Sequence, residues 1–231
     1  MTPRPYVFVN VAMTADGKID SIRRKGTTIS SSADKARVDQ LRATSDAVMV
    51  GGRTLINEDP RLTIRSATLR RLRLDQGLEE NPAKVGILSV ANIDLQGRFV
   101  TSGPARRLIY TTLRTPSETL TRLEKAGLQV FVQKRQGIDL RRVLRSLYAL
   151  GVRRLMVEGG GTLIAGLLRL DLVDELMIYL APRIFGGASA PTLADGPGFL
   201  PARSPALKLI SVNKLDDEDG ILVHYMIKHK E

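Results

Sequence analysis

The chain lacks cysteine and tryptophan, and it has only two histidines among 231 residues. Without cysteine there is no disulfide framework, no thiolate nucleophile and no cysteine-ligated zinc site. Two histidines leave little for a histidine metal cluster. No window supplies the roughly 18 consecutive apolar residues that a membrane-spanning helix needs. We therefore expect no metal and no membrane partner, and any catalysis has to use other groups.

Basic side chains exceed acidic ones by 35 to 24, and 43% hydrophobic content is ample for a buried core. Arginine outnumbers lysine by 25 to 10, which favours recognition of phosphate or carboxylate by the planar guanidinium. Runs such as Arg23–Lys25 can equally be solvated surface. Aromatic residues are only 4%, and no basic stretch interleaves with stacking residues. We expect a phosphorylated small molecule rather than nucleic acid, and keep a nucleic-acid-binding module as an alternative.

No low-complexity linker or internal repeat divides the chain, so we expect a single domain over residues 1–231. The first residues run into an apolar segment without a cleavage pattern, which favours a cytoplasmic location. β-rich or apolar runs predict strands over 6–13, 46–50, 85–88, 108–111, 155–157 and 176–180. Helices are expected over 35–44, after 115, over 140–147 and over 163–170. Alternating strands and helices favour a largely parallel sheet.

Capping residues support three of these helices. Ser31 or Ser32 precedes the first, and Asp139 precedes the third, whose apolar residues follow the i, i+3, i+4, i+7 spacing. Thr115 is expected to cap the second, followed by proline at the first helical position and a capping-box acid.

The carboxyl-terminal part has a different pattern. Residues 207–212 and 221–227 flank the acidic turn Asp216–Gly220, which predicts an antiparallel hairpin. We therefore expect an α/β sandwich of three layers with a mixed, mostly parallel sheet that ends in this hairpin. The apolar segment 176–180 could pair or pack across a two-fold axis.

Two glycine turns follow predicted strands, where α/β proteins bind ligands. In Glu158–Thr162 three successive glycines would let a diphosphate approach the backbone, although a tight turn without a ligand is the alternative. The pattern is neither the G-x-G-x-x-G fingerprint nor a Walker loop. Glu158 lies between a buried strand and this loop, so its carboxylate needs a partner or a task.

The earlier turn, Gly51–Gly52, leads into a segment with two acids and three arginines. Arg61 and Arg65 would lie on one side of an extended segment, opposite the two apolar residues between them. Two guanidinium groups so placed could clamp one phosphate, and a surface pair is the alternative.

Several segments together resemble the riboflavin-biosynthesis pyrimidine reductases, in order and spacing over nearly the whole chain. This family comprises the reductase half of bacterial bifunctional deaminase-reductases and the free-standing archaeal and fungal reductases. The matching segments are Thr14–Ile19, Leu41–Ala43, Val50–Thr54, Asp59–Thr63, Met156–Leu163, Val173–Glu175, Ala181–Pro182 and Phe185–Gly187. The resemblance implies a dihydrofolate-reductase-like fold.

The resemblance also implies reduction of a ribosylaminopyrimidine 5′-phosphate to its ribitylamino form by NADPH, and a homodimer. It implies catalytic roles for Lys18 and Glu158. Substrate contacts fall on Arg42, Arg61 and Arg65, and coenzyme contacts on Thr54, Glu58, Gly159, Gly160, Gly161, Thr162, Leu163 and Ile164.

Three questions stay open. The family has an aspartate where this chain has Glu58 followed by Asp59, so either acid could face the coenzyme. The zinc-deaminase motif is absent, so we expect the chain only to reduce its substrate. That substrate could be the 2,5-diamino pyrimidinone or the deaminated uracil, which differ in one exocyclic group that the sequence does not identify. Reduction of another heterocycle, such as a dihydropterin or dihydrofolate, is an alternative within the same fold.

Overall fold

The structure is a computed structural model that describes residues 3–215 and 217–229, and the chain divides into two compact units. Unit 1 is built around Asp39–Met156. Unit 2 is built around Tyr6–Val38 and the described part of Val157–Glu231. Among the described residues, no helix combines the length and the apolar character needed to cross a membrane.

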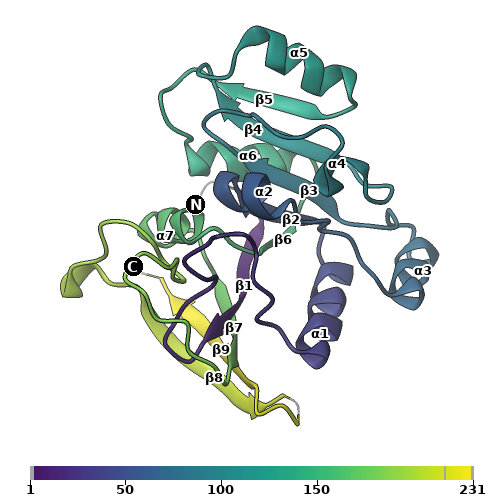
Figure 1. The fold of residues 1–231 in the computed structure, drawn as a ribbon. Coiled ribbons are helices and arrows are strands. Elements are labelled where there is room, and N and C mark those ends of the chain that lie inside the picture. Colours follow the sequence, from purple (N-terminus) through teal and green to yellow (C-terminus); the bar gives the residue numbers. More distant parts are fainter. Residues whose placement is uncertain (1–2, 216, 230–231) are drawn as a thin grey trace. The chain divides into compact units, whose positions relative to one another are not determined.

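Unit 1 contains a sheet with the strand order β5-β4-β3-β2-β6 (Figure 1). The pairs β2–β3, β3–β4 and β4–β5 are parallel, as expected from the alternation of strands and helices. Every residue of β2 and β3 is buried, which explains the apolar run of β2, whereas β3 also contains a buried lysine, Lys84. The strands are β2 (Ala47–Gly51), β3 (Ala83–Ile87), β4 (Arg107–Thr112), β5 (Gln129–Gln133) and β6 (Arg154–Val157).

Helices cover both faces of this sheet. On one face, a Cβ on Gly86 would meet the side chains of Leu55 from α2 and Ile109 from β4. On the other, the Tyr110 hydroxyl donates to Ser146 Oγ of α6 at 2.8 Å. Figure 1 shows α2 in front of the strands of this unit and α6 behind them. The helices are α2 (Gly52–Glu58), α3 (Ala67–Asp75), α4 (Arg98–Thr101), α5 (Ser117–Lys125) and α6 (Leu140–Ala149), and α1 (Ser32–Ala43) joins the two units in sequence.

Unit 2 contains the strand order β1-β7-β9-β8. The β1–β7 pair is parallel, and β7–β9 and β9–β8 are antiparallel. The predicted terminal hairpin is thus confirmed, and Lys214 Nζ lies 2.8 Å from the Asp219 carboxylate at its turn. Asp216, which the sequence also places in this turn, lies outside the described residues. The elements are β1 (Tyr6–Thr14), α7 (Gly161–Arg169), β7 (Glu175–Ala181), the short 3-10 helix η1 (Pro201–Arg203), β8 (Ala206–Lys214) and β9 (Ile221–Lys228).

The predicted helix caps are confirmed at two helices and wrong at a third. Ser31 Oγ accepts from the Asp34 amide at 3.2 Å, and the Asp139 carboxylate accepts from the Arg142 amide at 3.2 Å. Thr115 instead accepts from the Ala91 amide at 3.0 Å, in the buried interior. Helix α5 begins at Ser117, and Pro116 takes the N-cap position instead of the expected first helical position, so no side chain caps the helix.

The expectation that residues 176–180 could pair as strands across a two-fold axis is wrong, whereas packing across such an axis stays a prediction. This segment is part of β7, and both of its edges are hydrogen-bonded within unit 2, to β1 and to β9. Exposed apolar side chains lie instead on β8, at the end of the strand order. They are Leu207, Leu209, Ile210 and Val212.

Four elements of unit 1 have no counterpart in the sequence-based expectations: α2, α3, α4 and β5. Helix α3 depends on tertiary contacts of Arg73, which is only 4% exposed. Its guanidinium donates to the carbonyls of Ala43 and Ser45 at 2.8 and 2.9 Å. Burial lowers the pKa of this arginine, opposed by the charges of Asp46 and Glu79. An arginine on this helix therefore holds the end of α1, which no local pattern indicates.

Candidate active site

Helix α2 carries the two candidate coenzyme contacts of unit 1. Thr54 and Glu58 are four residues apart and therefore share one side of the helix, and both are half-buried. Leu55, on another side, is only 3% exposed and anchors the helix. The turn before α2 is close-packed, because a Cβ on Gly52 would lie 3.1 Å from the Ile87 carbonyl oxygen.

The acid next to Glu58 has a structural task. Asp59 ends α2 with φ of 43°, and its carboxylate accepts from the backbone amides of Arg98 and Phe99 at 2.6 and 2.9 Å. These amides open α4, so Asp59 acts as the acidic group at that helix start. Of the two acids that the sequence leaves open, Asp59 is thus the one whose carboxylate is seen to hold the start of α4.

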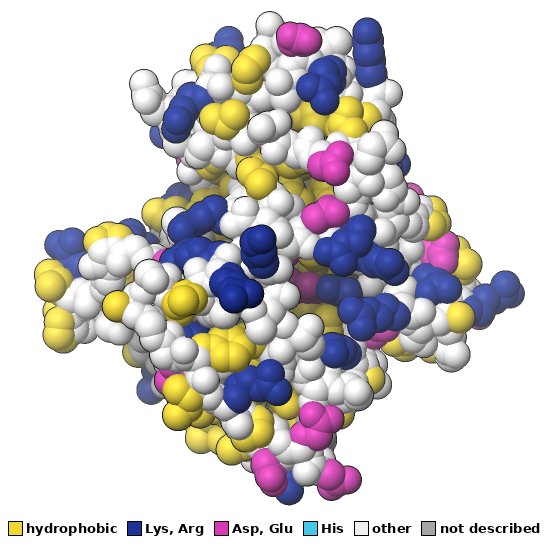
Figure 2. Space-filling model, in the orientation of Figure 1, with side chains coloured by type: hydrophobic (Ala, Val, Ile, Leu, Met, Phe, Trp, Pro, Cys, Tyr) yellow, Lys and Arg dark blue, Asp and Glu magenta, His cyan; other side chains and the backbone are white. Residues whose placement is uncertain are grey.

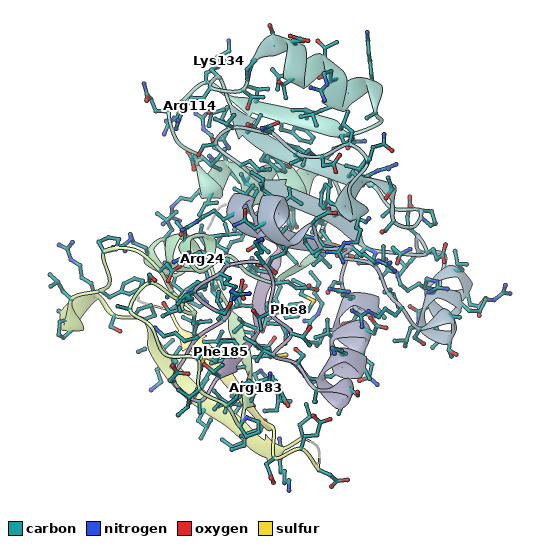
Figure 3. The ribbon with its side chains drawn as sticks, viewed as in Figure 1. Phe8, Arg24, Arg114, Lys134, Arg183 and Phe185 are labelled. Carbon is teal, nitrogen blue, oxygen red and sulfur yellow. The ribbon has the colours of Figure 1, made fainter. Side chains whose placement is uncertain are left out.

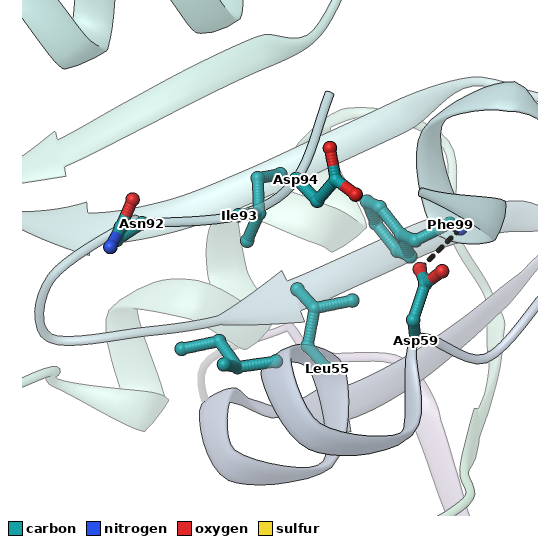
Figure 4. Close-up of a pocket in the computed structure, with 7 residues that line it drawn as sticks. Leu55, Asp59, Asn92, Ile93, Asp94 and Phe99 are labelled. Atoms are coloured by element: carbon teal, nitrogen blue, oxygen red, sulfur yellow. Dashed lines mark hydrogen bonds between the residues drawn. The ribbon is translucent and has the colours of Figure 1, made fainter. Parts of the chain in front are cut away.

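A cavity of about 380 Å³ lies beside α2, and Figure 4 shows the Asp59–Phe99 hydrogen bond at one end of it. Its wall combines apolar side chains with the polar side chains of Asp59, Asn92 and Asp94. The lining residues are Leu55, Ile56, Asp59, Asn92, Ile93, Asp94 and Phe99.

The candidate phosphate-binding arginines of unit 1 lie on one docked segment. Arg61 and Arg65 are exposed, whereas Leu62 and Ile64 are 1% and 2% exposed, so the predicted alternation is confirmed. The segment is not a strand, because Leu62 adopts φ of 53°. Arg42 joins this group, since its guanidinium donates to the Thr63 carbonyl at 2.8 Å.

Helix α1 fixes this segment through one carboxylate. Asp39, which is 6% exposed, accepts from the backbone amides of Arg65 and Ser66 at 2.9 and 3.0 Å. The hydrogen bond to Asp39 fixes the backbone of Arg65, and the side chain of Arg65 is exposed to solvent. Unit 1 thus places Arg42 against the segment that carries Arg61 and Arg65, and their substrate contacts stay a prediction.

The glycine loop of unit 2 precedes α7. Gly159 and Gly160 have φ of 139° and 84°, values that residues with a Cβ rarely adopt. A Cβ on Gly159 would have no atom within 4 Å, although the residue itself is buried. Helix α7 begins without a side-chain cap. An uncapped helix start with free space beside a glycine suits an anionic group such as a diphosphate.

The remaining residues of this loop differ in accessibility. Glu158 is half-buried and Thr162 is exposed. Leu163 and Ile164 are 7% and 0% exposed, and their amides donate to the Gly160 carbonyl at 2.8 and 3.1 Å. Both residues therefore pack within the first turn of α7, and their coenzyme contact stays a prediction.

Lys18 lies in a tight turn at the carboxyl end of β1. Its amide donates to Thr14 Oγ1 at 3.0 Å, and its carbonyl accepts from the Thr14 amide at 2.9 Å. Gly17 makes the turn possible with φ of 79°. These hydrogen bonds fix the backbone of this half-buried lysine and do not involve its side-chain ammonium group.

Asp16 ties this turn to the segment that follows β7. Its carboxylate accepts from Thr14 Oγ1 at 2.5 Å and from the amides of Phe185 and Gly186 at 3.2 and 2.8 Å. The Thr14 hydroxyl lowers the pKa of Asp16, outweighing desolvation, and the two amides lower it further. Figure 3 labels Phe185 and Arg183 on this segment. The sequence singled out the Asp-Gly-Lys motif but gave Asp16 no task.

The segment 183–205 had no assigned role in the sequence, and it contacts two candidate site segments. The Ile19 amide donates to the Pro191 carbonyl at 3.0 Å, and Lys18 forms an isolated bridge with Thr192. The Asp195 amide donates to the Gly161 carbonyl at 3.1 Å. Unit 2 therefore connects the Lys18 turn to the glycine loop through residues 191–195.

Arginine and lysine side chains occur over much of the face shown in Figure 2, and acidic ones are fewer there. This distribution is compatible with an anionic ligand. In the part of the chain that the structure describes, no group of three or more His, Asp or Glu side chains is placed to hold a metal ion.

Comparison with known proteins bears directly on this arrangement. The family model described as "RibD C-terminal domain" matches residues 5–219. The chain is 46% identical to the 2,5-diamino-6-ribosylamino-4(3H)-pyrimidinone 5′-phosphate reductase of Archaeoglobus fulgidus over 85% of this chain and 89% of that protein. It is 36% identical to the protein of the same name from Methanothermobacter thermautotrophicus, over 97% of this chain and 99% of that protein.

Solved structures support the fold. A pyrimidine reductase-like protein from Corynebacterium diphtheriae aligns with a TM-score of 0.84 at 19% identity, covering 98% of this chain and 93% of that one. Dihydrofolate reductase from Enterococcus faecalis aligns with a TM-score of 0.50 at 12% identity, covering 97% of each chain. The predicted dihydrofolate-reductase-like fold, with its mixed, mostly parallel strands and terminal hairpin, is thereby confirmed.

Proposed function

Because the chain belongs to the RibD C-terminal domain family, we propose that it reduces a ribosylaminopyrimidine 5′-phosphate to the ribitylamino product in riboflavin biosynthesis. The observation that carries this proposal is the 46% identity to the archaeal 2,5-diamino-6-ribosylamino-4(3H)-pyrimidinone 5′-phosphate reductase, which favours the non-deaminated ring. The family model spans residues of both units, so we assign both to one reductase domain over residues 1–231.

The proposed reductant is a nicotinamide coenzyme, and NADPH is the specific form we propose. It fits the free space at the Cβ position of Gly159 and the uncapped start of α7, where the amides favour a diphosphate. Thr54 and Glu58 supply a hydroxyl and a carboxylate from one side of α2 for its polar groups. When bound, the nicotinamide supplies the hydride that reduces C1′ of the opened sugar.

The proposed substrate phosphate binds to arginines. Arg65 and Arg61 present exposed guanidinium groups on a segment whose backbone is fixed by α1, and Arg42 lies against the same segment. Planar guanidinium groups bind phosphate bidentately, which fixes orientation as well as affinity. The arginines would thus bind the substrate through its phosphate, which takes no part in the reduction at C1′.

Lys18 and Glu158 are the proposed catalytic residues. Reduction of an imine at C1′ requires a proton at the adjoining nitrogen, and the Lys18 ammonium supplies or stabilises it. Glu158 accepts hydrogen bonds from ribose hydroxyl groups and so orients the open sugar. The turn that holds the Lys18 backbone leaves only the side-chain torsions to be fixed when substrate binds.

We also propose a homodimer and a cytoplasmic location. The exposed apolar side chains of β8, with Leu209 and Val212 more than half exposed, support self-association through the outer strand of unit 2. Light scattering on the purified protein tests this, and a monomer at micromolar concentration contradicts it.

The proposed activity is tested by following oxidation of NADPH, and in parallel NADH, with three substrates. These are the 2,5-diamino pyrimidinone phosphate, its deaminated uracil counterpart and dihydrofolate. We expect turnover with the diamino compound and faster turnover with NADPH. Turnover of dihydrofolate alone would establish the alternative reductase, and no turnover with any substrate would refute the proposal.

A further inference from the structure

Residues 191–195 form a compact turn in unit 2 that is built around one carboxylate. Asp195 Oδ1 accepts from the amide of Thr192 and from its hydroxyl, both at 2.9 Å. The side chain of Asp195 thus fixes the Thr192 peptide and its rotamer together. This acid is half-buried and is not among the residues to which the resemblance assigns a role.

The same turn is packed against the first residue of α7. A Cβ on Gly161 would collide with the Thr192 carbonyl oxygen and would lie 3.0 Å from Asp195 Cγ. In addition, the Asp195 amide donates to the Gly161 carbonyl. Gly161 therefore lacks a side chain because this turn occupies the space, whereas Gly159 borders open space.

On its other side, the 191–195 turn contacts the Lys18 turn. The Pro191 carbonyl accepts from the Ile19 amide at 3.0 Å, and Thr192 bridges to Lys18. A single turn thus contacts the loop proposed to bind the coenzyme and the residue proposed to handle the proton. Loss of its internal hydrogen bonds would loosen both neighbours at once.

We propose that Asp195 is a positioning residue that couples the Gly159–Gly161 loop to the Lys18 turn. It touches neither coenzyme nor substrate in this role, and acts by holding Thr192 between the two segments. The role in catalysis rests on the proposed function, whereas the coupling of the two segments does not. The carboxylate serves as a hydrogen-bond acceptor here, so an amide oxygen can replace it.

The test compares Asp195→Ala with Asp195→Asn, and uses Asp139→Ala as a matched control. Asp139 also accepts a backbone amide, but at the start of α6 in unit 1. For each protein we would measure the Kd for NADPH by fluorescence, kcat and KM for the diamino pyrimidinone phosphate, the thermal unfolding midpoint, and hydrogen exchange of the Ile19 amide.

For Asp195→Ala we expect the Kd for NADPH to rise about tenfold, kcat to fall about tenfold, and Ile19 to exchange at least tenfold faster. Asp195→Asn should stay within threefold of the parent in all of these, because its amide oxygen still accepts from Thr192. Asp139→Ala should lower the unfolding midpoint while leaving the Kd unchanged, which separates positioning from general stability.

Two results would overturn the inference: unchanged Ile19 exchange and NADPH affinity in Asp195→Ala, or equal impairment of Asp195→Asn and Asp195→Ala. Failure of the proposed function is distinguishable from this. If the parent protein oxidises NADPH with neither pyrimidine, the reductase assignment falls, while Ile19 exchange still decides whether Asp195 couples the two segments.

Discussion

The turns at Gly51–Gly52 in unit 1 and Gly159–Gly161 in unit 2 both lead from a strand into a helix, but they need glycine for different reasons. Gly51 has an ordinary extended conformation, with φ of −77°, and Gly52 is small because the Ile87 carbonyl and Leu88 lie against it. Gly159 and Gly160 have positive φ, and Gly159 borders open space.

This difference shows that a run of glycines does not by itself indicate a ligand. Close packing within the chain accounts for Gly52 and Gly161, and backbone conformation accounts for Gly159 and Gly160. The second turn combines positive φ with free space at the Cβ position of Gly159, which favours the diphosphate contact proposed there. The first turn has neither feature.

The largest effect should come from Gly160→Val. A β-branched residue is strained at φ of 84° and would distort the loop before α7. We expect the Kd for NADPH to rise at least about 100-fold, by fluorescence titration, which corresponds to about 3 kcal/mol. Gly52→Ala is the matched control, with a loss of about 1–2 kcal/mol in unfolding free energy from tight packing and an affinity within threefold. Equal affinity losses in the two variants would remove the contrast between the turns.

Arg65→Ala tests the proposed phosphate contact of unit 1. Loss of a charge-assisted hydrogen bond to phosphate, worth about 1.5–3 kcal/mol, should raise the KM for the phosphorylated pyrimidine about 10- to 100-fold. The Kd for NADPH should not change. Arg71→Ala is a suitable control, because this exposed arginine pairs with Asp75 on the surface of α3. A KM within twofold of the parent would show that Arg65 is solvated surface.

Substitutions of the neighbouring acids Glu58 and Asp59 should have different effects, one on coenzyme affinity and the other on the free energy of unfolding. Asp59→Ala removes the acceptor for two amides at the start of α4 and should lower the unfolding free energy by about 1–2 kcal/mol in urea titrations. Glu58→Gln should leave stability nearly unchanged and weaken NADPH several-fold. The reverse pattern would assign the coenzyme contact to Asp59.

The smallest effect concerns Lys84, a fully buried lysine that donates to the carbonyls of Phe99 and Ser102 at 2.9 and 2.6 Å. Burial lowers its pKa to about 8, with Arg107 contributing in the same direction. Because the unfolded chain holds this proton up to about pH 10.4, the unfolded state binds more protons in that window. Lys84 should therefore make unfolding free energy rise, by about 1 kcal/mol, between pH 9 and 10.

Urea titrations of the parent and of Lys84→Met across this range isolate the contribution of Lys84. The slope with pH should be smaller in the variant, and the midpoint of its denaturation lower at every pH, because two carbonyls lose their donor. Identical slopes would mean that Lys84 titrates at its ordinary value. The sequence does not indicate that Lys84 is buried, because a lysine beside an apolar run is expected at the exposed end of a strand.

The amino-acid sequence by itself determined the local features: the alternation of strands and helices, the cap at Asp139, the buried stripe of α6 and the terminal hairpin. These depend on periodicity and on contacts between residues a few positions apart, so they are written into short stretches of chain. The resemblance of ordered motifs added the candidate site residues, including Lys18 and Arg65.

Tertiary structure alone decided what each polar group contacts. Thr115 reads as a helix cap but accepts from Ala91, and Asp59, one of two acids that could face the coenzyme, holds the start of α4. Gly161 is small because Thr192 lies against it. Helix α3 likewise depends on Arg73 reaching the end of α1. The physical reason is shared: a hydrogen bond or a close contact is satisfied by whichever atom the fold brings near, and that atom lies many residues away in the sequence.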